Sequence, residues 1–492
     1  MPMPIDRRQF LATLSGVALT TAFHPWPSRH RTTAPPDWQE LDRRLDGRLL
    51  LRGSPGYADH RLGYNQLDDD QYPAAVALCT SPSDVQHCLD LARGHGLPIA
   101  ARSGGHSYLG YSVPDGGLVV DLRSMAQVDV RPDGTTAIGP GARLIEVYTA
   151  LARAGRLLPA GACPTVGIGG LALGGGIGVL ARAYGLTCDR LTAAQVVTAD
   201  GTLREASPDS EPDLHWALRG GGGGNFGVVT ALEFRTEPAQ DLTVFSLGFP
   251  AGSAADLLGA WLSWTPGTPR AFWSSLLING GTPPDPHLVG CHVGPQSAAD
   301  QLLDSLIATA GVRPDSRSVQ TKDYLGAMTY MAGCSAKTLA QCRPTAEGGT
   351  LSRDAFLAGS RLVGPTPPDA GRVTDLLLGR DGSYLLFDAL GGAVADLAPD
   401  ATAFPHRAAP ASIQIFTETT PAGRTGARDT VAALRDGLTR LGTEGSYVNY
   451  LDATLPDWGH AYYGTNLDRL RATALRYDPD AVFAFPQSVL NA

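Results

Sequence analysis

Glycine is concentrated in three short clusters of this chain, and these clusters constrain its fold more than any other feature. They are RSGGHSYLG at residues 102–110, GACPTVGIGGLALGGGIG at 161–178 and RGGGGGNFG at 219–227. Consecutive small residues let backbone N–H groups converge on an anion such as a pyrophosphate, and bare backbone allows close approach of a large flat ligand. A tight turn is the alternative for the first cluster. A flexible linker is the alternative for the third, although it lies between a helix end containing Trp216 and a strand at 228–229.

The second cluster contains the spacing of a dinucleotide-binding fingerprint, but its surroundings argue against one. Residues 167–172, GIGGLA, match G-x-G-x-x-A, and Asp189 follows 19 residues after Gly170. That motif needs a strand before it, a helix after it and an acidic residue at the end of a second strand. Pro164 interrupts the first strand, residues 174–176 would break the helix, and Asp189 does not end an apolar strand. The sequence therefore disfavours a nicotinamide-dependent reductase.

Hydrophobic periodicity around the clusters predicts alternating short strands and helices. Strands are predicted at 74–78, 97–101, 118–122, 136–138 and 242–249. One helix follows a cap at Ser81 with Pro82 in its first position, and has apolar residues at 85, 88, 89 and 92. Others are predicted at 144–151, ended by Gly155, and at 430–441. Residues 68–238 thus form an α+β or α/β unit.

Composition and motif content exclude several classes of protein. The 492 residues are 43% hydrophobic, which supplies a sizeable core and excludes a disordered or fibrous chain. The net charge is −9, without a basic tract beyond the N-terminus, so no nucleic-acid partner is expected. No GK[ST], HExxH, GxSxG or EF-hand motif occurs, and no metal is expected. Seven cysteines include no CxxC pair, so one is unpaired or used outside a disulfide.

The N-terminus resembles an export signal. Residues 6–11 read DRRQFL and precede a mostly apolar stretch at 11–23, which is too short to span a bilayer. Twin arginines before a short apolar region predict a twin-arginine signal, and the alternative is an ordinary amphipathic start. No other stretch approaches about 18 apolar residues, so no membrane partner is expected. Twin-arginine export moves folded proteins, which predicts a cofactor acquired inside the cell.

The clusters and their flanking motifs carry a family resemblance. The motifs are RSGGHS, CPTVGIGGLALGGGIG, YGLTCDRL, VVTADG and DLHWALRGGGGGNFGVVT, followed near the C-terminus by YVNYLD and YYGTNLDRL. With them, the chain resembles the berberine-bridge-enzyme-like branch of the FAD-linked oxidases, which share the vanillyl-alcohol-oxidase fold. The resemblance covers nearly all of the chain after residue 40 and is weaker from 240 to 440. It implies an α+β fold with a two-part PCMH-type FAD-binding domain and a substrate domain whose antiparallel sheet is covered by helices.

The resemblance also implies a division of the chain. The predicted parts are a signal and linker at 1–35, the FAD-binding domain at 36–238, the substrate-binding domain at 239–444 and a returning C-terminal segment at 445–492.

Two residues of the glycine clusters are implied to bond the flavin covalently. In the family, a histidine in the GGH motif bonds the 8α-methyl carbon and a cysteine in the CxxVGxGG motif bonds C6, and these positions are His106 and Cys163 here. Imidazole and thiolate are nucleophiles suited to electron-poor carbons near neutral pH. The alternative for each is an ordinary packed core residue. If Cys163 holds the flavin, six cysteines remain, and Cys334 with Cys342 is the closest plausible disulfide in an exported protein.

The remaining cofactor contacts are predicted in the glycine clusters and the C-terminal segment. They are Arg102, Ser103, Gly104, Gly105, Ser107, Gly110, Val166, Gly167, Gly169, Gly170, Gly174, Gly178, Gly227, Val228 and Asn449.

A tyrosine and an aspartate are implied as the catalytic pair. The family's base lies in the YxNY motif, which places it at Tyr450, with Asp388 of DALGG as its proton-accepting neighbour. A tyrosine has a pKa of about 10 and needs such a relay at neutral pH. The alternative, a structural tyrosine, applies more to Tyr447. Ile177 and Leu390 replace a tyrosine and an aromatic or histidine of some relatives, which puts a second tyrosine couple and any transferred substrate in doubt.

The sequence therefore predicts a secreted flavoprotein oxidase with bicovalent FAD. Its substrate is predicted to be a small molecule with a sugar hydroxyl or a natural-product alcohol, and its second substrate is dioxygen, reduced to hydrogen peroxide. The alternatives are a dehydrogenase or oxidative cyclase that uses another acceptor and, in another class, a non-catalytic flavin-bearing binding protein.

Overall fold

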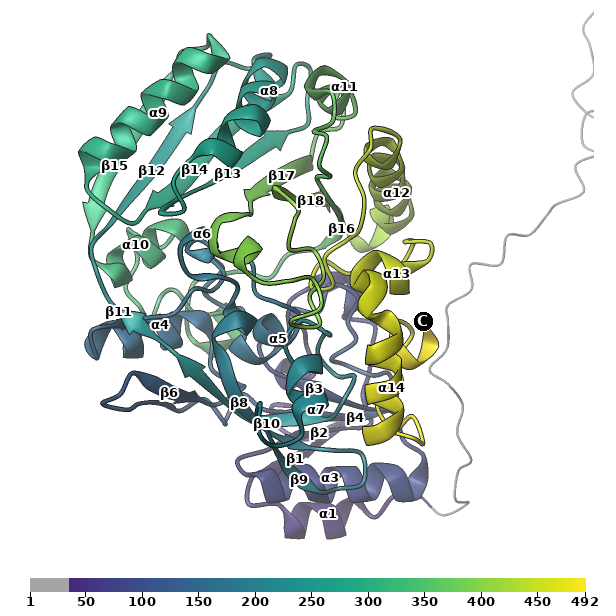
Figure 1. Ribbon diagram of the computed structural model, residues 1–492. Helices are drawn as coiled ribbons and strands as arrows, with labels where there is room; N and C mark the ends of the chain where they lie inside the picture. Colours follow the sequence, from purple (N-terminus) through teal and green to yellow (C-terminus); the bar gives the residue numbers. More distant parts are fainter. Residues whose placement is uncertain (1–34) are drawn as a thin grey trace, which may run out of the picture.

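The computed structural model describes residues 35–492, so the predicted export signal lies outside the described residues. In this range the chain forms sheets of four, five and seven strands, with helices packed against them, and a two-stranded ribbon (Figure 1). The predicted α+β class is confirmed. The boundaries of the predicted signal, domains and C-terminal segment stay a prediction. The strands of the four-, five- and seven-stranded sheets follow one another along the chain, each sheet in its own range of residues.

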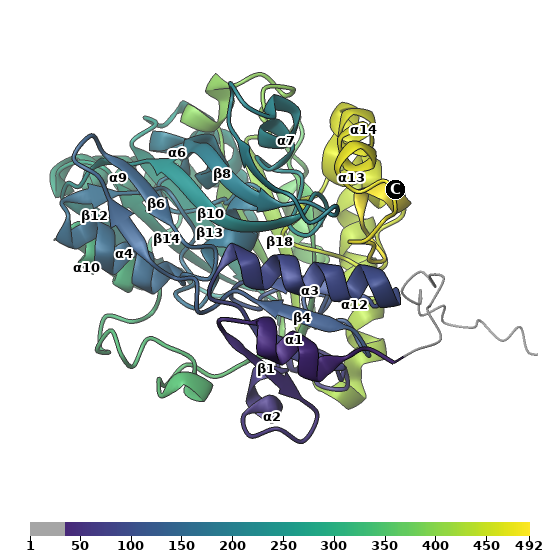
Figure 2. The same cartoon turned by 90° about the horizontal axis from the view of Figure 1, so that it is seen from below.

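The four-stranded sheet lies at the N-terminal end of the described chain. Its order is β1-β2-β4-β3, with β1 antiparallel and the other neighbours parallel. Seen from below, α1 and α3 lie alongside this sheet (Figure 2). The Ser81 side chain caps α3 by accepting from the Asp84 N–H, and Gly96 ends the helix at φ +59°. The elements are β1 Arg48–Leu51, β2 Ala75–Leu78, β3 Ile99–Arg102, β4 Leu118–Asp121, α1 Trp38–Arg44, α2 Tyr57–His60 and α3 Pro82–His95.

The five-stranded sheet is antiparallel throughout, in the order β5-β6-β10-β8-β9. It follows the first sheet in the sequence. The second and third glycine clusters lie in its connections, whereas the first cluster follows β3 of the four-stranded sheet. Its elements are β5 Val128–Val130, β6 Thr135–Ile138, β8 Leu191–Val197, β9 Leu203–Ala206, β10 Val228–Arg235, α4 Leu144–Arg153, α5 Ile168–Leu173, α6 Ala181–Tyr184 and α7 Pro212–Ala217. The ribbon pairs β7 Arg156–Leu157 with β11 Glu237–Pro238.

The seven-stranded antiparallel sheet has the order β15-β12-β14-β13-β17-β18-β16. Helices α8, α9, α11 and α12 cover one face, as Figure 1 shows. The predicted helix at 430–441 begins earlier, at Arg424, and forms α12. The elements are β12 Leu242–Gly248, β13 Phe272–Asn279, β14 Asp285–His292, β15 Ser316–Lys322, β16 Phe356–Leu362, β17 Ser383–Ala389, β18 Ala411–Glu418, α8 Ala254–Trp264, α9 Gln296–Ala310, α10 Tyr324–Met331, α11 Ala370–Asp375 and α12 Arg424–Arg440.

Side-chain alternation gives this sheet a second, functional face. On β17, Leu385 and Phe387 are fully buried, and Phe387 packs edge-on against Trp261 of α8. Because successive residues of a strand point to opposite faces, Tyr384 and Asp388 lie on the face away from α8. That face is available for a ligand site.

The C-terminal segment packs against the part of the chain that holds the five-stranded sheet. Helices α13, Trp458–Tyr463, and α14, Leu467–Tyr477, follow the large sheet, and α14 packs against α7. The Ala199 N–H donates to the Tyr477 carbonyl over 3.3 Å. Figure 1 shows this yellow segment running down one side of the molecule past both parts.

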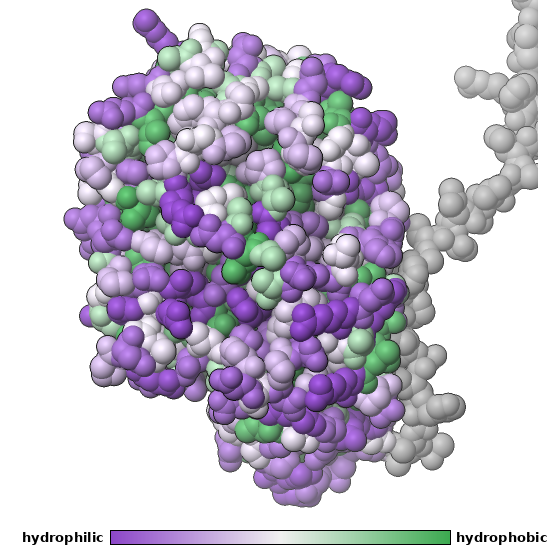
Figure 3. Space-filling view, in the orientation of Figure 1, coloured by the Kyte–Doolittle hydropathy of each residue, from purple (hydrophilic) through white to green (hydrophobic). Residues whose placement is uncertain are grey.

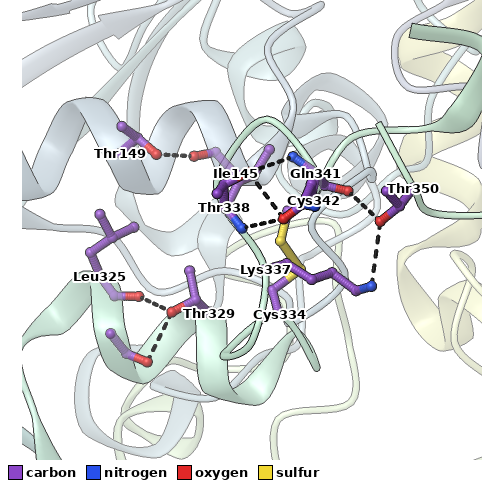
Figure 4. Close-up of a disulfide and its surroundings, with 11 residues drawn as sticks. Ile145, Thr149, Leu325, Thr329, Cys334, Lys337, Thr338, Gln341, Cys342 and Thr350 are labelled. Atoms are coloured by element: carbon purple, nitrogen blue, oxygen red, sulfur yellow. Dashed lines mark hydrogen bonds between the residues drawn. A yellow bond between two sulfur atoms is a disulfide. The ribbon is translucent and has the colours of Figure 1, made fainter. Parts of the chain in front are cut away.

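The predicted Cys334–Cys342 disulfide is confirmed. The bond closes a short loop after α10 and packs beside Ile145 of α4 (Figure 4). The five other cysteines, including Cys163, are free thiols. No helix in residues 35–492 is long and apolar enough to cross a membrane. On the face drawn in Figure 3, apolar side chains occur as small separate groups among polar ones.

Candidate active site

A cavity of about 470 Å³ lies where the glycine clusters, the open face of the large sheet and the C-terminal segment meet. Its size falls in the range of small-molecule and cofactor sites, about 300–1,000 Å³. Residues of all three clusters line it, as do Tyr384 on β17, Gln414 and Phe416 on β18, and Tyr450. The tertiary structure thus brings segments more than 300 residues apart to one site.

Most predicted cofactor residues line this cavity, and four of them do not. Those on its wall are Ser103, Gly104, Gly105, His106, Ser107, Cys163, Val166, Gly167, Gly169, Gly170, Gly227, Val228 and Asn449. Arg102, Gly110, Gly174 and Gly178 lie outside the lining.

These four residues act within the protein. Arg102 is buried and pairs with Asp121 at 2.7 Å. A Cβ on Gly178 would lie 1.9 Å from the Ala160 carbonyl oxygen, and a Cβ on Gly174 would lie 2.1 Å from the Asn449 side chain. Gly110 has φ +66°, and a Cβ there would lie 2.7 Å from the Asp68 carboxyl carbon. These glycines make room for neighbouring protein atoms rather than for a ligand.

The first two glycine clusters interlock. A Cβ on Gly104 would lie 2.3 Å from the Gly167 backbone nitrogen, and one on Gly167 would lie 2.0 Å from Ser103 Oγ. In contrast, a Cβ on Gly170 or Gly223 would meet nothing within 4 Å. The bare backbone therefore serves two purposes, since some glycines let two segments touch and others face the cavity.

The two predicted attachment residues lie side by side on the cavity wall. Thr165 Oγ1 lies 2.9 Å from His106 Nε2 and 3.5 Å from Cys163 Sγ. The Tyr64 ring stacks on the imidazole with centroids 4.0 Å apart. Burial, and then the positive charge of Arg143, lower the pKa of His106 to about 3, while a hydrogen bond with the Thr165 backbone opposes the shift. The imidazole is therefore neutral at physiological pH, as a nucleophile requires.

Tyr450 also lines the cavity, and its hydroxyl has no hydrogen-bond partner among the described residues. Its ring stacks on that of Tyr108, with centroids 5.7 Å apart and planes 6° apart. Burial, followed by the charge of Asp388, raises the pKa of Tyr450 well above its usual value of 10.0. The phenol is therefore protonated at rest and faces an open site.

Tyr447, three residues earlier, is arranged differently. Its hydroxyl accepts from the Gly176 N–H at 2.8 Å, the Ile177 N–H at 3.3 Å and Asn449 Nδ2 at 2.8 Å. This residue is buried and ties the second glycine cluster to the C-terminal segment, which is a structural role.

Asp388 does not reach the cavity lining, and it makes no hydrogen bond to the Tyr450 hydroxyl. It lies opposite Ser275 and Ser412 in the sheet register, on the same face as Tyr384. Burial raises the pKa of Asp388 to about 6, and an interaction with Ser275 opposes the shift. The carboxyl is thus poised to exchange a proton near neutral pH, close enough to influence Tyr450 electrostatically.

Sequence reasoning missed an aromatic and polar wall of the cavity. Tyr384 stacks on Phe416 with centroids 4.7 Å apart, and Gln414 Nε2 donates to the Tyr108 hydroxyl at 2.6 Å. The Tyr64 hydroxyl donates to the Asp354 carboxylate on the same wall. Tyr108 lies in the motif of the first glycine cluster, so the sequence could have indicated it. Tyr384, Gln414 and Phe416 lie on strands, where the only local pattern is the alternation of side chains between the two faces.

Comparison with known proteins assigns the family. Residues 73–207 match the family described as FAD binding domain, and residues 446–490 match that described as berberine and berberine like. The uncharacterised FAD-linked oxidoreductase YgaK of Bacillus subtilis is 34% identical over 456 residues, covering 91% of this chain and 97% of that protein. The chain belongs to the berberine-bridge-enzyme-like family of FAD-linked oxidoreductases.

Two further relatives agree with this assignment. The chitooligosaccharide oxidase of Gibberella zeae is 32% identical over 463 residues, covering 89% of this chain and 91% of that protein. The solved structure of BBE-like 1 from Physcomitrella patens matches with a TM-score of 0.86 and 28% identity, covering 92% of this chain and 99% of that one. The predicted resemblance is confirmed, and the protein is an FAD-dependent oxidoreductase.

The residues of this family member fit an FAD molecule. Ile99 of β3, the third glycine cluster and the tyrosines of the C-terminal segment all line the cavity, so a bound cofactor would contact all three parts. Gly170 and Gly223 leave open space along it, and His106 and Cys163 supply two nucleophiles on one wall. The nicotinamide-dependent reductase, which the sequence disfavours, finds no support at Asp189, whose carboxylate pairs with Arg407 at 2.7 and 2.8 Å.

Proposed function

We propose that this enzyme is a secreted oxidase that holds FAD covalently through His106 and Cys163 and oxidises an alcohol. The reaction converts a CH–OH group to a carbonyl and reduces dioxygen to hydrogen peroxide. The observation that carries the proposal is that Tyr450 shares one cavity with His106 and Cys163, with its hydroxyl free to contact a substrate. Bound FAD would accept a hydride from the substrate carbon.

The protein's part in this reaction is to move a proton. Tyr450 accepts the proton of the substrate hydroxyl and at the same time gives its own phenol proton to a second group. It must give that proton away because its pKa is raised, so the protonated phenol is its resting form. Asp388 is the acceptor within electrostatic reach, and a water molecule bridges the two groups in this proposal. The pKa of Asp388, about 6, matches a group that must gain and lose a proton near neutral pH.

The wall opposite the glycine clusters supports a carbohydrate substrate. Tyr384 and Phe416 present stacked aromatic rings, while Gln414 and Asp354 supply polar groups on the same wall. Apolar ring faces beside hydrogen-bonding groups suit sugar rings, whose C–H faces and hydroxyl edges differ in polarity. A relative that is named a chitooligosaccharide oxidase points in the same direction. The DRRQFL motif is the support for secretion.

Anaerobic flavin bleaching tests the reaction. The purified full chain, mixed without dioxygen with a panel of oligosaccharides, monosaccharides and secondary alcohols, is expected to lose its oxidised flavin absorbance with at least one oligosaccharide. Under air, peroxide should form in equal amount to oxidised product. Bleaching without peroxide would show a dehydrogenase, and no bleaching across the panel would contradict an alcohol substrate.

Acid precipitation tests the covalent cofactor separately. The denatured protein is expected to carry its flavin into the pellet. Flavin absorbance in the supernatant would contradict covalent attachment without affecting the assignment of the substrate.

A further inference from the structure

Thr165 touches both predicted flavin-attachment residues, although it is neither a nucleophile nor a glycine of the clusters. Its Oγ1 lies 2.9 Å from His106 Nε2 and 3.5 Å from Cys163 Sγ. The side chain is almost fully buried, with 3% of its surface exposed. A buried hydroxyl placed between an imidazole and a thiol links the protonation of the two groups.

The backbone around Thr165 is fixed from outside the cavity. The Leu144 and Ile145 N–H groups, at the start of α4, donate to the carbonyls of Val166 and Pro164 at 2.9 and 3.1 Å. Arg143 Nη1 donates to the Thr165 carbonyl at 3.3 Å, and its guanidinium is in turn paired with Glu347. The backbone of Thr165 is therefore held by Arg143, Leu144 and Ile145, which do not line the cavity.

We propose that Thr165 is a positioning residue for flavin attachment. Its hydroxyl oxygen accepts a hydrogen bond from His106 Nε2–H, and its O–H donates a hydrogen bond to the Cys163 sulfur. This inference rests on the covalent attachment in the proposed function. Accepting from Nε2–H selects the tautomer in which Nδ1 carries the lone pair. Nδ1 has no hydrogen-bond partner among the described residues and is the nitrogen available to bond a carbon. Donating to sulfur favours the thiolate, which is the reactive form of cysteine.

Each attachment is an oxidation that balances with dioxygen. A bond forms from Nδ1 or Sγ to a flavin carbon, and one proton leaves the nucleophile and one leaves that carbon. The two electrons pass to the flavin and then to dioxygen, which takes up two protons to give hydrogen peroxide. Thr165 supplies no electrons and stays unchanged, so its removal should slow attachment without blocking it.

The position of the link can be read by mass. Cleavage after arginine gives a peptide of residues 103–123 with His106 and one of 157–182 with Cys163. The full-length protein and its variants are expressed side by side, sampled during expression, and the linked fraction of each peptide is measured. We expect Thr165→Val to lower the rate at which the 103–123 peptide is linked by about fivefold, the effect of one hydrogen bond.

Four further variants make the result specific. Thr165→Ser keeps a hydroxyl and should restore linkage. Thr149→Val is the matched control, because its hydroxyl donates only to the Ile145 carbonyl within α4, and it should behave as wild type. Cys163→Ala with Thr165→Val, compared with Cys163→Ala alone, isolates the histidine link and should show the same loss. Near-ultraviolet circular dichroism on each variant separates misfolding from slow attachment.

The outcomes separate this inference from the proposed function. A wild-type chain with both links, and Thr165→Val with both links at the same rate, would overturn the role of Thr165 alone. A wild-type chain whose two peptides carry no flavin would overturn covalent attachment and this inference with it. Loss of linkage in Thr165→Val that Thr165→Ser does not restore would also overturn the inference, because it would assign the effect to packing.

Discussion

Two tyrosines three residues apart in the C-terminal segment have opposite surroundings. Tyr447 accepts three N–H groups in a buried position, whereas the Tyr450 hydroxyl faces the cavity without a partner among the described residues. The motif YVNY contains both residues, but the sequence alone does not show which hydroxyl faces the cavity. The difference arises because the N–H groups of Gly176 and Ile177, from a distant cluster, donate to the hydroxyl of Tyr447 and not to that of Tyr450.

Replacing each tyrosine by phenylalanine should separate catalysis from stability. Tyr450→Phe is expected to lower kcat about 100- to 10,000-fold, as loss of a proton-transfer group does, while thermal unfolding changes little. Tyr447→Phe leaves buried N–H groups without an acceptor and should cost about 1–3 kcal/mol of unfolding free energy. Steady-state kinetics and thermal unfolding of both variants measure this. Near-normal turnover in Tyr450→Phe would refute its assignment as the base.

The raised pKa of Asp388 predicts a pH dependence. Burial raises this pKa to about 6, so the carboxylate form that accepts a proton is present only above that pH. We expect kcat to rise as pH increases through about 6, and Asp388→Asn to show lower kcat without this rise. Asp396→Asn is the control, since Asp396 lies in an exposed pair with Arg270. A rise that persists in Asp388→Asn would assign the titration to another group.

At the scale of elements, the glycine clusters both line the cavity and form contacts between neighbouring segments. The loop before α5 touches the loop after β3 through Gly104 and Gly167, and the turn after α5 touches the Ala160 carbonyl through Gly178. Close backbone approach of this kind leaves no space for a methyl group. The elements around the cavity are therefore held by the same glycines that were predicted to face the flavin.

A methyl group added at Gly178 should be destabilising even though this residue does not line the cavity. The new Cβ would lie 1.9 Å from a backbone oxygen, and overpacking of this kind typically costs about 1–3 kcal/mol. Gly426→Ala is the matched control, because a Cβ there meets nothing within 4 Å and the residue lies inside α12, where alanine is favoured by about 0.5–1 kcal/mol. Thermal unfolding measures both. Equal midpoints for the two variants would contradict the packing argument.

At the scale of the whole molecule, the C-terminal segment joins the two parts of the enzyme. It begins beside β16, supplies Asn449 and Tyr450 to the cavity and continues as α13 and α14 along the FAD-binding part. A buried ion pair fixes it to α12, since Asp452 accepts from Arg435 Nη1 at 2.7 Å with both side chains 6% exposed or less. The position of Tyr450, the proposed base, thus depends on a helix that packs on the large sheet.

Breaking this ion pair should affect both folding and turnover. Asp452→Asn removes the buried carboxylate charge beside Arg435 and leaves Arg435 paired with the half-exposed Asp436, so it is expected to cost up to about 3–5 kcal/mol of unfolding free energy. It should also lower kcat, because the segment that carries Tyr450 loses an anchor two residues away. Asp396→Asn again serves as the control, with an expected cost of about 1 kcal/mol or less for an exposed pair. Thermal unfolding and kinetics check this, and similar midpoints for the two variants would refute the anchoring role.

The sequence by itself determined the family and the α+β class, and it predicted the glycine-rich and C-terminal segments of the site and the residues suited to holding a flavin. These follow from local patterns, namely glycine clusters, caps, apolar periodicity and short motifs around His106, Cys163 and Tyr450. It also pointed to the Cys334–Cys342 disulfide, whose partners are close in the chain.

Only the tertiary structure decided how these pieces act together. It showed that Gly178 packs on Ala160 rather than on a ligand, that Tyr384 and Asp388 share the open face of β17, and that Thr165 lies between His106 and Cys163. The physical reason is that these contacts join residues that are distant in the sequence. A local pattern sets the conformation of a few residues, whereas the contact of Gly178 depends on Ala160 and the hydroxyl of Thr165 bonds to His106, 59 residues away in the chain.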